Sequence, residues 1–275
     1  MGAVMPTLEE KYRCLVDLIA ARQSVAVAFS GGVDSSFLCR VAKDVLGDKA
    51  IAITIVSPML PKSEIDCATA VSRQVGINHI FVEEGEIEED VAANPRERCY
   101  FCKKREFGRI IEAARERGID TVLDGSNVDD LGDFRPGLKA LEELHVFSPL
   151  REAGMTKADI RALSRRFDLP TWDKPAFACL ASRIPYGERI DREKLNRIEQ
   201  AEDYLRSLGF RQFRVRSHGD IARIEAARDE RRRFFDEKVL DEVSQTLKTF
   251  GFLYVAFELE GYVMGNMNKV LTQQA

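Results

Sequence analysis

The sequence predicts an α/β fold, a doubly wound parallel sheet followed by a small C-terminal α+β domain. Three observations predict it. Short apolar runs alternate with segments of helical periodicity through the first half of the 275 residues, as in βαβ units, whose right-handed crossovers put helices on both faces of a parallel sheet. Glycines follow the helical patterns. From residue 191 the order becomes helix, strand, strand, helix, strand, which indicates a separate small domain.

The first half should contain four strands separated by three helices. The strands are expected at residues 24–30, 51–56, 79–82 and 121–124, where apolar, often β-branched residues run together. The helices are expected at 35–46, 63–75 and 98–117, with Ser63 as an N-cap and Gly47, Gly76 and Gly118 as stops.

The second half begins with a proline-rich stretch and ends in the small domain. Short helices are expected near 135–144 and 157–167, among five prolines that suggest irregular backbone around a site. The small domain should comprise a helix at 191–208, strands at 213–216 and 221–225, a helix at 230–250 and a strand at 253–259. The expected domain limits are therefore 1–187 and 188–275.

The composition is that of a soluble globular protein, with 45% hydrophobic and 31% charged residues. A net charge of −4 does not point to a nucleic acid or a membrane as partner. There is no apolar run of about 18 residues and no secretory signal pattern, so we expect a cytoplasmic protein. Its six cysteines are then expected to be thiols.

The strongest motif is the glycine-rich loop at residues 30–36, Ser-Gly-Gly-Val-Asp-Ser-Ser, between the first strand and the first helix. Glycines allow a sharp turn and a close approach to a ligand. Consecutive N–H groups and a helix N-terminus suit an anion, and Ser30, Ser35 and Ser36 add hydroxyl donors. The loop lacks the lysine of a Walker A motif.

This loop resembles the PP-loop of ATP pyrophosphatases such as GMP synthetase, NAD synthetase and tRNA thiolation enzymes. The resemblance implies that Ser30, Gly31, Gly32, Ser35 and Ser36 bind ATP, whose α-phosphate is attacked while pyrophosphate leaves. It also implies that Asp34 helps to hold Mg²⁺ or to orient the phosphates. Fixed donors and a metal would stabilise the charge that gathers on the leaving group.

Three cysteines are candidates for chemistry. Cys99 and Cys102 share one face at the start of a helix, where the N-terminus and the following lysines should lower their pKa. A lone CxxC is compatible with zinc, a redox pair, an iron–sulfur cluster or no function. With Cys179, in the proline-rich segment, three thiolates would suit a [4Fe-4S] cluster with one open iron. Cys14, Cys39 and Cys67 have apolar helical neighbours and are expected to pack.

Arg214 and Arg216 alternate along one expected strand, so both should point to the same face. Two guanidinium groups on one face suit a phosphate or carboxylates, and the alternative is a solvated strand face. Glu202 and Glu225 are candidate ligands of a divalent metal, although single glutamates usually lie on the surface.

Together these features resemble the LarE-type sulfur transferases, the PP-loop family that makes pyridinium-3,5-bisthiocarboxylic acid mononucleotide, a precursor of the nickel-pincer nucleotide of lactate racemase. The matching segments, which cover nearly the whole chain, are SGGVDS from Ser30, CYFCKK from Cys99, LDGSN from Leu123, DFRPGLKA from Asp133, SPLREAGMTKADIRAL from Ser148, CLASRIPYG from Cys179, AEDYLRSLGF from Ala201 and RVRSHGDIARIE from Arg214. One branch of the family sacrifices the sulfur of a single cysteine, and another uses three cysteines and a [4Fe-4S] cluster. This chain resembles the second.

The resemblance implies that ATP adenylates a substrate carboxylate and that sulfur then displaces AMP. Gly125 and Lys103 would join the ATP site, and Cys99, Cys102 and Cys179 would hold the cluster. Arg183 would lie near the phosphates, Arg214 and Arg216 would bind the substrate phosphate, and Glu202 and Glu225 could bind a metal. The family is usually a homo-oligomer, with the C-terminal domain as the expected contact and substrate-binding part. One departure is Val263, where the family often has arginine after Gly-Tyr.

Two other functions remain open. Another PP-loop enzyme, an amide synthetase or a tRNA thiolation enzyme, would need an ammonia source or a basic RNA-binding module. A non-catalytic nucleotide-binding module would bind ATP without releasing pyrophosphate.

Overall fold

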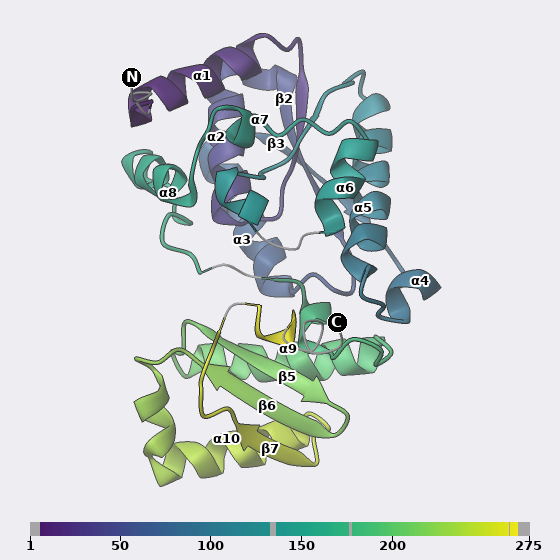
Figure 1. Ribbon diagram of the computed structural model, residues 1–275, viewed down its shortest axis with the longest axis vertical. Coiled ribbons are helices and arrows are strands. Elements are labelled where there is room, and N and C mark those ends of the chain that lie inside the picture. The colour runs from purple at the N-terminus through teal and green to yellow at the C-terminus, as the bar shows by residue number, and fades with distance from the viewer. Residues whose placement is uncertain (1–5, 133–135, 176–177, 264, 269–275) are drawn as a thin grey trace. The chain divides into compact units, whose positions relative to one another are not determined.

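A computed structural model describes residues 6–132, 136–175, 178–263 and 265–268 (Figure 1). The chain forms two compact units, the first from residues 1–85 and 99–177 and the second from 86–98 and 178–275. Residues 178–187, which the sequence suggested as the end of the first domain, pack with the second unit. The functional division of the chain into a nucleotide-binding and a substrate-binding part stays a prediction.

The first unit is built on a four-stranded sheet in the order β3-β2-β1-β4, with all pairs parallel. The strands are β1 (Val25–Ala28), β2 (Ala50–Val56), β3 (Asn78–Glu83) and β4 (Val122–Leu123). Val25 is in register with Ala50, and Ala26 with Val122. The order reverses direction between β1 and β4, and a crevice at the carboxyl ends of such strands is where doubly wound sheets bind ligands.

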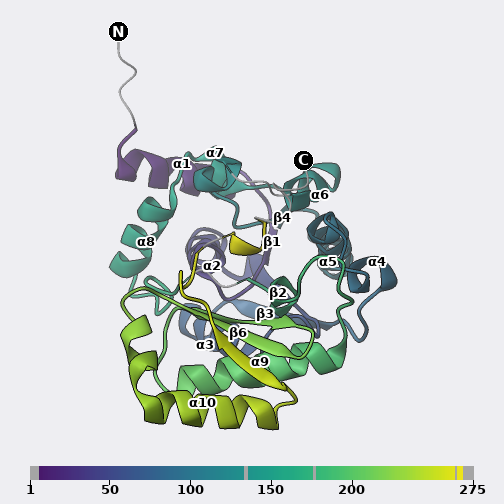
Figure 2. The same cartoon turned by 60° about the horizontal axis from the view of Figure 1, so that its bottom comes forward.

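Helices cover both faces of this sheet, as a doubly wound fold requires (Figure 2). Val25 and Val27 of β1 pack in one core cluster, and Ala26 packs in another. The first cluster includes residues of α1 (Leu8–Ala20), α2 (Val33–Leu46), α3 (Lys62–Val75) and α8 (Lys157–Arg166). The second includes residues of α5 (Arg98–Arg115) and α6 (Pro136–Glu143). The predicted α/β class is therefore confirmed.

Glycines follow the ends of the helices as predicted, but the predicted N-cap of α3 is wrong. Gly76 and Gly118 both take the left-handed conformation, at φ +71°, directly after or near the last turns of α3 and α5. The N-cap of α3 is Pro61 and not Ser63, because the helix already begins at Lys62. The predicted motif that starts at Asp133 lies partly outside the described residues.

The second unit contains a three-stranded sheet in the order β5-β6-β7. β5 (Phe213–His218) and β6 (Ile221–Ala226) are antiparallel, whereas β7 (Tyr254–Phe257) is parallel to β6. Two helices pack on the sheet, α9 (Arg192–Ser207) and α10 (Glu237–Thr249). Shorter elements are α4 (Glu89–Ala92) and the 3₁₀ segments η3 (Leu180–Arg183) and η4 (Arg231–Phe235) in this unit, and α7 (Pro149–Glu152) in the first.

The helix predicted at 230–250 is interrupted. Residues 231–235 form η4, and Asp236 then caps α10 by accepting a hydrogen bond from the N–H of Lys238 at 2.9 Å. An aspartate competes for backbone N–H groups and so favours a helix start over a helix interior. No helix in the described part of the chain has the length and apolar character needed to cross a membrane.

Candidate active site

The glycine-rich loop joins β1 to α2 at the carboxyl edge of the sheet. Gly31 has φ +70°, and a Cβ atom there would lie 3.1 Å from the backbone of both Glu64 and Ala68 on α3. Both constraints favour glycine at this position. Gly32 is the N-cap of α2, and no side chain caps the helix there. The N-terminus of α2 is thus open to an anion, as the motif predicts.

The predicted serines gather around the same turn. The hydroxyl oxygens of Ser30 and Ser35 lie 3.2 Å apart, and the N–H of Ser30 donates to Ser35 Oγ at 3.3 Å. Ser36 is fully buried, and its hydroxyl has no hydrogen-bond partner within the described structure. The loop therefore places hydroxyl groups beside the backbone donors that would meet a phosphate chain.

The end of β4 meets this loop at the reversal point of the sheet. A Cβ atom on Gly125 would lie 3.2 Å from the N atom of Ser35, so the backbone after β4 approaches α2 closely. The buried Asp124 accepts hydrogen bonds from the Ser148 hydroxyl and, at 3.1 Å, from the N–H of Ser126. The structure therefore brings Gly125 to the phosphate loop, as the resemblance implied.

Asp34, in the first turn of α2, fits the role of a magnesium ligand. Its Oδ2 accepts a hydrogen bond from Lys157 Nζ, while its buried Oδ1 has no partner among the described residues. Burial raises the pKa of Asp34, and the ammonium group of Lys157 opposes that rise. A carboxylate oxygen without a protein partner, beside a loop predicted to bind phosphate, is the type of ligand that Mg²⁺ prefers.

Two lysines at this site were not singled out from the sequence. Lys157, at the start of α8, lies 123 residues from Asp34 in the chain. Lys174 donates to the Gly31 carbonyl at 3.0 Å and to Glu64 Oε2 at 2.8 Å. Neighbours along one helix or strand produce a periodic sequence pattern, whereas contacts over such sequence separations leave no periodic signal. Both lysines are paired with carboxylates, Lys157 with Asp34 and Lys174 with Glu64.

Cys99 and Cys102 lie in the first turns of α5, with Cys99 exposed and Cys102 partly buried. Lys103 follows them, and its ammonium group lies 4.7 Å from the ring centre of Phe107. Loss of hydration alone would lower the pKa of Lys103, but Glu106, Asp124 and the two thiols raise it. Lys103 thus remains a cation between the cysteines and the end of β4. Lys104 instead pairs with Glu143, at 2.8 Å.

In the second unit, Arg183 is completely buried. Its Nε and Nη2 donate to the two carboxylate oxygens of Glu202, at 2.8 and 2.9 Å. Its Nη1 donates to the carbonyls of Ala178 and Cys179, the latter at 3.0 Å. The bidentate pair therefore holds the backbone on either side of Cys179. For Glu202 to bind a metal, the metal would have to displace this guanidinium group.

Arg214 and Arg216 do share one face of β5, and both are buried. Arg216 donates to Glu225 Oε2 at 2.8 Å and to the Ser182 carbonyl at 2.9 Å. Arg214 lies over the ring of Tyr262, 5.0 Å from its centre. Burial and the nearby Arg183 lower the pKa of Arg214 to about 10, so it is still charged at neutral pH. A buried charge with a strongly shifted pKa is typical of a binding site.

The three candidate cluster ligands are divided between the units. Cys179 is exposed in the second unit, whereas Cys99 and Cys102 belong to the first. Arg98 belongs to the second unit and directly precedes Cys99, and it donates to the Ala181 carbonyl at 3.1 Å. Among the described residues, there is no group of three or more His, Cys, Asp or Glu side chains that could hold a metal ion. The cluster ligands, like the metal roles of Glu202 and Glu225, stay predictions.

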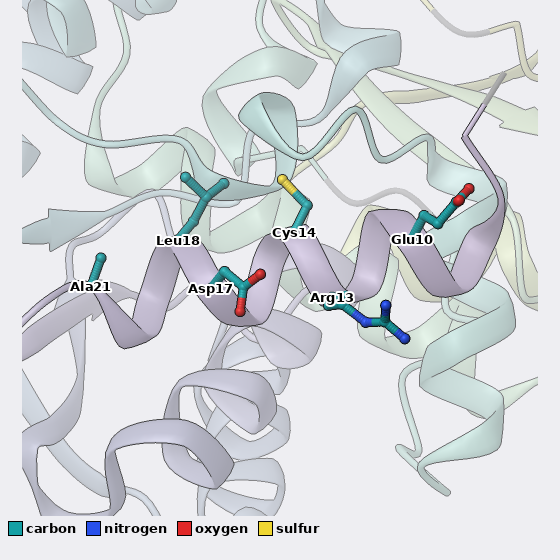
Figure 3. Close-up of a pocket in the computed structure, with 6 residues that line it drawn as sticks. All are labelled: Glu10, Arg13, Cys14, Asp17, Leu18 and Ala21. Carbon is teal, nitrogen blue, oxygen red and sulfur yellow. The ribbon is translucent and has the colours of Figure 1, made fainter. Parts of the chain in front are cut away.

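Hollows also lie away from the phosphate loop. One, of about 400 Å³, lies along α1 and contains none of the predicted site residues (Figure 3). Another, of about 290 Å³, lies in the second unit. It is lined by Pro185, Tyr186, His218, Arg223, Glu258, Glu260, Asn266 and Met267. His218 shares the face of β5 with Arg216, so this cavity offers space beside the arginine-bearing face of the sheet.

Comparison with known proteins agrees with this geometry. Residues 13–132 match the asparagine synthase family model. An uncharacterised protein of Synechocystis sp. is 45% identical over 97% of this chain and 100% of its own length. The pyridinium-3,5-bisthiocarboxylic acid mononucleotide synthase of Lactiplantibacillus plantarum is 38% identical over 98% of both chains. An uncharacterised protein of Methanocaldococcus jannaschii is 29% identical over 93% of this chain and 94% of its own.

The asparagine synthase model covers the part of the chain that contains the phosphate loop and the end of β4. The likeness to the Lactiplantibacillus synthase also includes the arginine-bearing sheet and the segment around Cys179. Its identity and coverage mean that the chain belongs to the pyridinium-3,5-bisthiocarboxylic acid mononucleotide synthase family, within the PP-loop ATP pyrophosphatases.

Proposed function

We propose that the chain is an ATP-dependent sulfur transferase that converts a carboxylate of pyridinium-3,5-biscarboxylic acid mononucleotide into a thiocarboxylate. The product would serve the synthesis of the nickel-pincer nucleotide used by lactate racemase. One observation carries the proposal: the near full-length likeness to the Lactiplantibacillus synthase, which includes the phosphate loop at the sheet's reversal point.

In the first half-reaction, a substrate carboxylate oxygen attacks the α-phosphorus of ATP. A new O–P bond forms while the bond to the β-phosphate breaks, and pyrophosphate leaves. The N–H groups at the start of α2 and the hydroxyls of Ser30 and Ser35 would hold the β- and γ-phosphates. Asp34 would ligate Mg²⁺ through its unpartnered oxygen, and Lys157 would add charge beside it.

In the second half-reaction, a sulfur nucleophile attacks the activated carbonyl carbon. The C–S bond forms, the C–O bond to AMP breaks, and AMP leaves with the carboxylate oxygen. Arg214 would hold the substrate phosphate, because it is a buried cation with a lowered pKa. The exposed Cys179 would lie at the point of sulfur delivery, on a backbone that Arg183 holds.

For the sulfur source, we favour the three-cysteine branch. All six cysteines are free, and Cys99, Cys102 and Cys179 match the donor chemistry of a [4Fe-4S] cluster. Such a cluster would supply an open iron that holds a transferable sulfide. The alternative is sacrifice of the Cys179 sulfur itself. The chain should work in the cytoplasm, as a homo-oligomer, on a small nucleotide and not on nucleic acid.

Pyrophosphate release tests the adenylation step. We expect release only when ATP and the pyridinium mononucleotide are both present, and none from the Asp34→Ala variant. Release driven instead by ammonia and a carboxylic acid, or by tRNA, would favour an amide synthetase or a tRNA thiolation enzyme. The match to the asparagine synthase model keeps that alternative open. ATP binding without any release would indicate a nucleotide-binding module.

Anaerobic purification tests the cluster separately. We expect iron and labile sulfide in about the four-to-four ratio of a [4Fe-4S] cluster, with loss of iron in Cys99→Ala, Cys102→Ala and Cys179→Ala variants. Cys14→Ala is a control, because Cys14, which the sequence wrongly predicted to pack, is a free, exposed thiol on α1. Absence of iron even after anaerobic reconstitution would leave Cys179 as the candidate donor.

A further inference from the structure

The carbonyl group of Gly31 is held by a lysine that lies 143 residues away in the chain. Lys174 Nζ donates to this oxygen at 3.0 Å and to Glu64 Oε2 at 2.8 Å. The lysine side chain is 19% exposed and the glutamate side chain 8%. A charged pair with so little solvent contact has a defined geometry, unlike a surface pair.

The direction of this carbonyl determines the direction of the next N–H group. In a trans peptide the C=O of one residue and the N–H of the next lie in the peptide plane and point in opposite directions. A carbonyl turned toward Lys174 therefore turns the N–H of Gly32 away from it. Glycines at both positions leave this peptide free to rotate unless something outside the loop holds it.

We propose that Lys174 is a positioning residue of the phosphate loop. Paired with Glu64, it holds the Gly31 carbonyl so that the Gly32 N–H faces the bound pyrophosphate moiety. Glu64 contributes twice, because its side chain orients Lys174 and its backbone carbonyl crowds the position where a Gly31 Cβ would lie. This role depends on the proposed binding of ATP by the loop.

A different role for Lys174 would be direct contact with the phosphates, and the two roles predict opposite effects of neutralising Glu64. If Lys174 positions the loop, Glu64→Gln leaves the lysine less firmly held, and phosphate binding weakens. If Lys174 binds phosphate itself, removing a carboxylate that competes for it strengthens phosphate binding.

The test is calorimetric titration of the full chain with inorganic pyrophosphate and Mg²⁺. We expect Lys174→Met to raise the Kd about tenfold, roughly the effect of losing one charge-assisted hydrogen bond. Lys174→Arg should stay within about threefold of wild type, because a guanidinium group can also donate to the carbonyl. Glu64→Gln should raise the Kd about threefold, since a neutral acceptor holds the lysine less firmly.

Lys43→Met is the matched control, because Lys43 pairs with Asp48 at 2.7 Å near the opposite end of α2. It removes the same charge from the same unit and should leave the Kd unchanged. A Lys174→Met protein with wild-type affinity, or tighter binding in Glu64→Gln, would overturn the positioning role. A wild-type chain that binds neither pyrophosphate nor ATP would instead contradict the proposed function.

Discussion

At the scale of single residues, burial decides what the charged side chains of the second unit can do. Burial alone would lower the pKa of Arg183 and raise that of Glu202, but their mutual attraction outweighs both effects. Both residues therefore remain charged and bound to each other, with side chains at most 2% exposed. Arg214 instead donates to the carbonyl of Phe213 at 2.6 Å and lies over the ring of Tyr262. The sequence correctly places Arg214 and Arg216 on one strand face, but it does not distinguish the contacts of Arg183 from those of Arg214.

The variant Arg183→Met should destabilise the protein by about 3–5 kcal/mol, because it leaves Glu202 buried without its counter-charge. The second substitution Glu202→Met should recover much of that loss, because it removes the uncompensated charge. Urea unfolding of the three variants and the wild type measures both effects. An Arg183→Met protein with unchanged stability and a raised KM for the substrate would show instead that Arg183 binds the substrate.

The variant Arg214→Gln should raise the KM for the pyridinium mononucleotide at least tenfold, a typical effect of removing a charge-assisted contact. Its KM for ATP should not change, because the phosphate loop belongs to the first unit. Arg189→Gln is the control, since Arg189 is an exposed arginine of the second unit that pairs with Glu89. Steady-state pyrophosphate release gives both constants. An equal rise in both would argue against a substrate-specific role.

At the scale of elements, periodicity and glycine positions predict the strands and helices well. α2, α3 and α9 begin and end within a few residues of the expected limits, because Gly47, Gly76 and Gly209 follow them and their apolar faces are regular. The break at Asp236 was missed, because the flanking residues 231–235 continue a helix-like pattern. Lys157 and Lys174 were missed because their partners lie on distant elements.

A row of polar side chains from β2, β3 and α3 contacts the backbone just before the phosphate loop. Thr54 of β2 donates its hydroxyl proton to the carbonyl of Phe29, the residue before the loop. His79 Nε2 of β3 lies 2.7 Å from the same hydroxyl oxygen. Its Nδ1 lies 3.0 Å from the hydroxyl of Ser72 on α3. Burial lowers the pKa of His79 to about 4.

This lowered pKa predicts a loss of stability in acid. In the unfolded chain His79 is protonated below about pH 6.5, whereas in the folded protein it is protonated only below about pH 4. Stability should therefore fall as the pH drops from about 6.5 toward 4. Allowing for the partial exposure of the ring, we expect wild type to lose about 1 kcal/mol more than His79→Gln between pH 7 and pH 5. Equal losses in urea unfolding would contradict this.

At the scale of the whole molecule, the second unit exposes several large apolar side chains. Phe235, Leu253, Tyr254 and Leu259 are each more than 60% exposed, and they lie in or near β7 and η4. β7 is an edge strand, and edge strands with exposed apolar residues are sites of association. The expected homo-oligomer would thus form through this unit.

The variant Tyr254→Asp should therefore dissociate the oligomer into smaller species, because it buries a charge in the proposed contact. Trp172→Asp is the control, since Trp172 is a partly exposed aromatic residue of the first unit. Light scattering after size-exclusion chromatography gives the masses. A wild-type monomer, or an oligomer that survives the Tyr254 change intact, would contradict the proposed contact.

The central claim is that one chain couples ATP cleavage to the replacement of a carboxylate oxygen by sulfur. The most direct test is mass spectrometry of the pyridinium mononucleotide after incubation with anaerobically purified protein, ATP and Mg²⁺. We predict a product whose mass has changed by the exchange of one oxygen for one sulfur, formed with one AMP per molecule. Formation of AMP and pyrophosphate with unchanged substrate, or with nitrogen in place of oxygen, would contradict the claim.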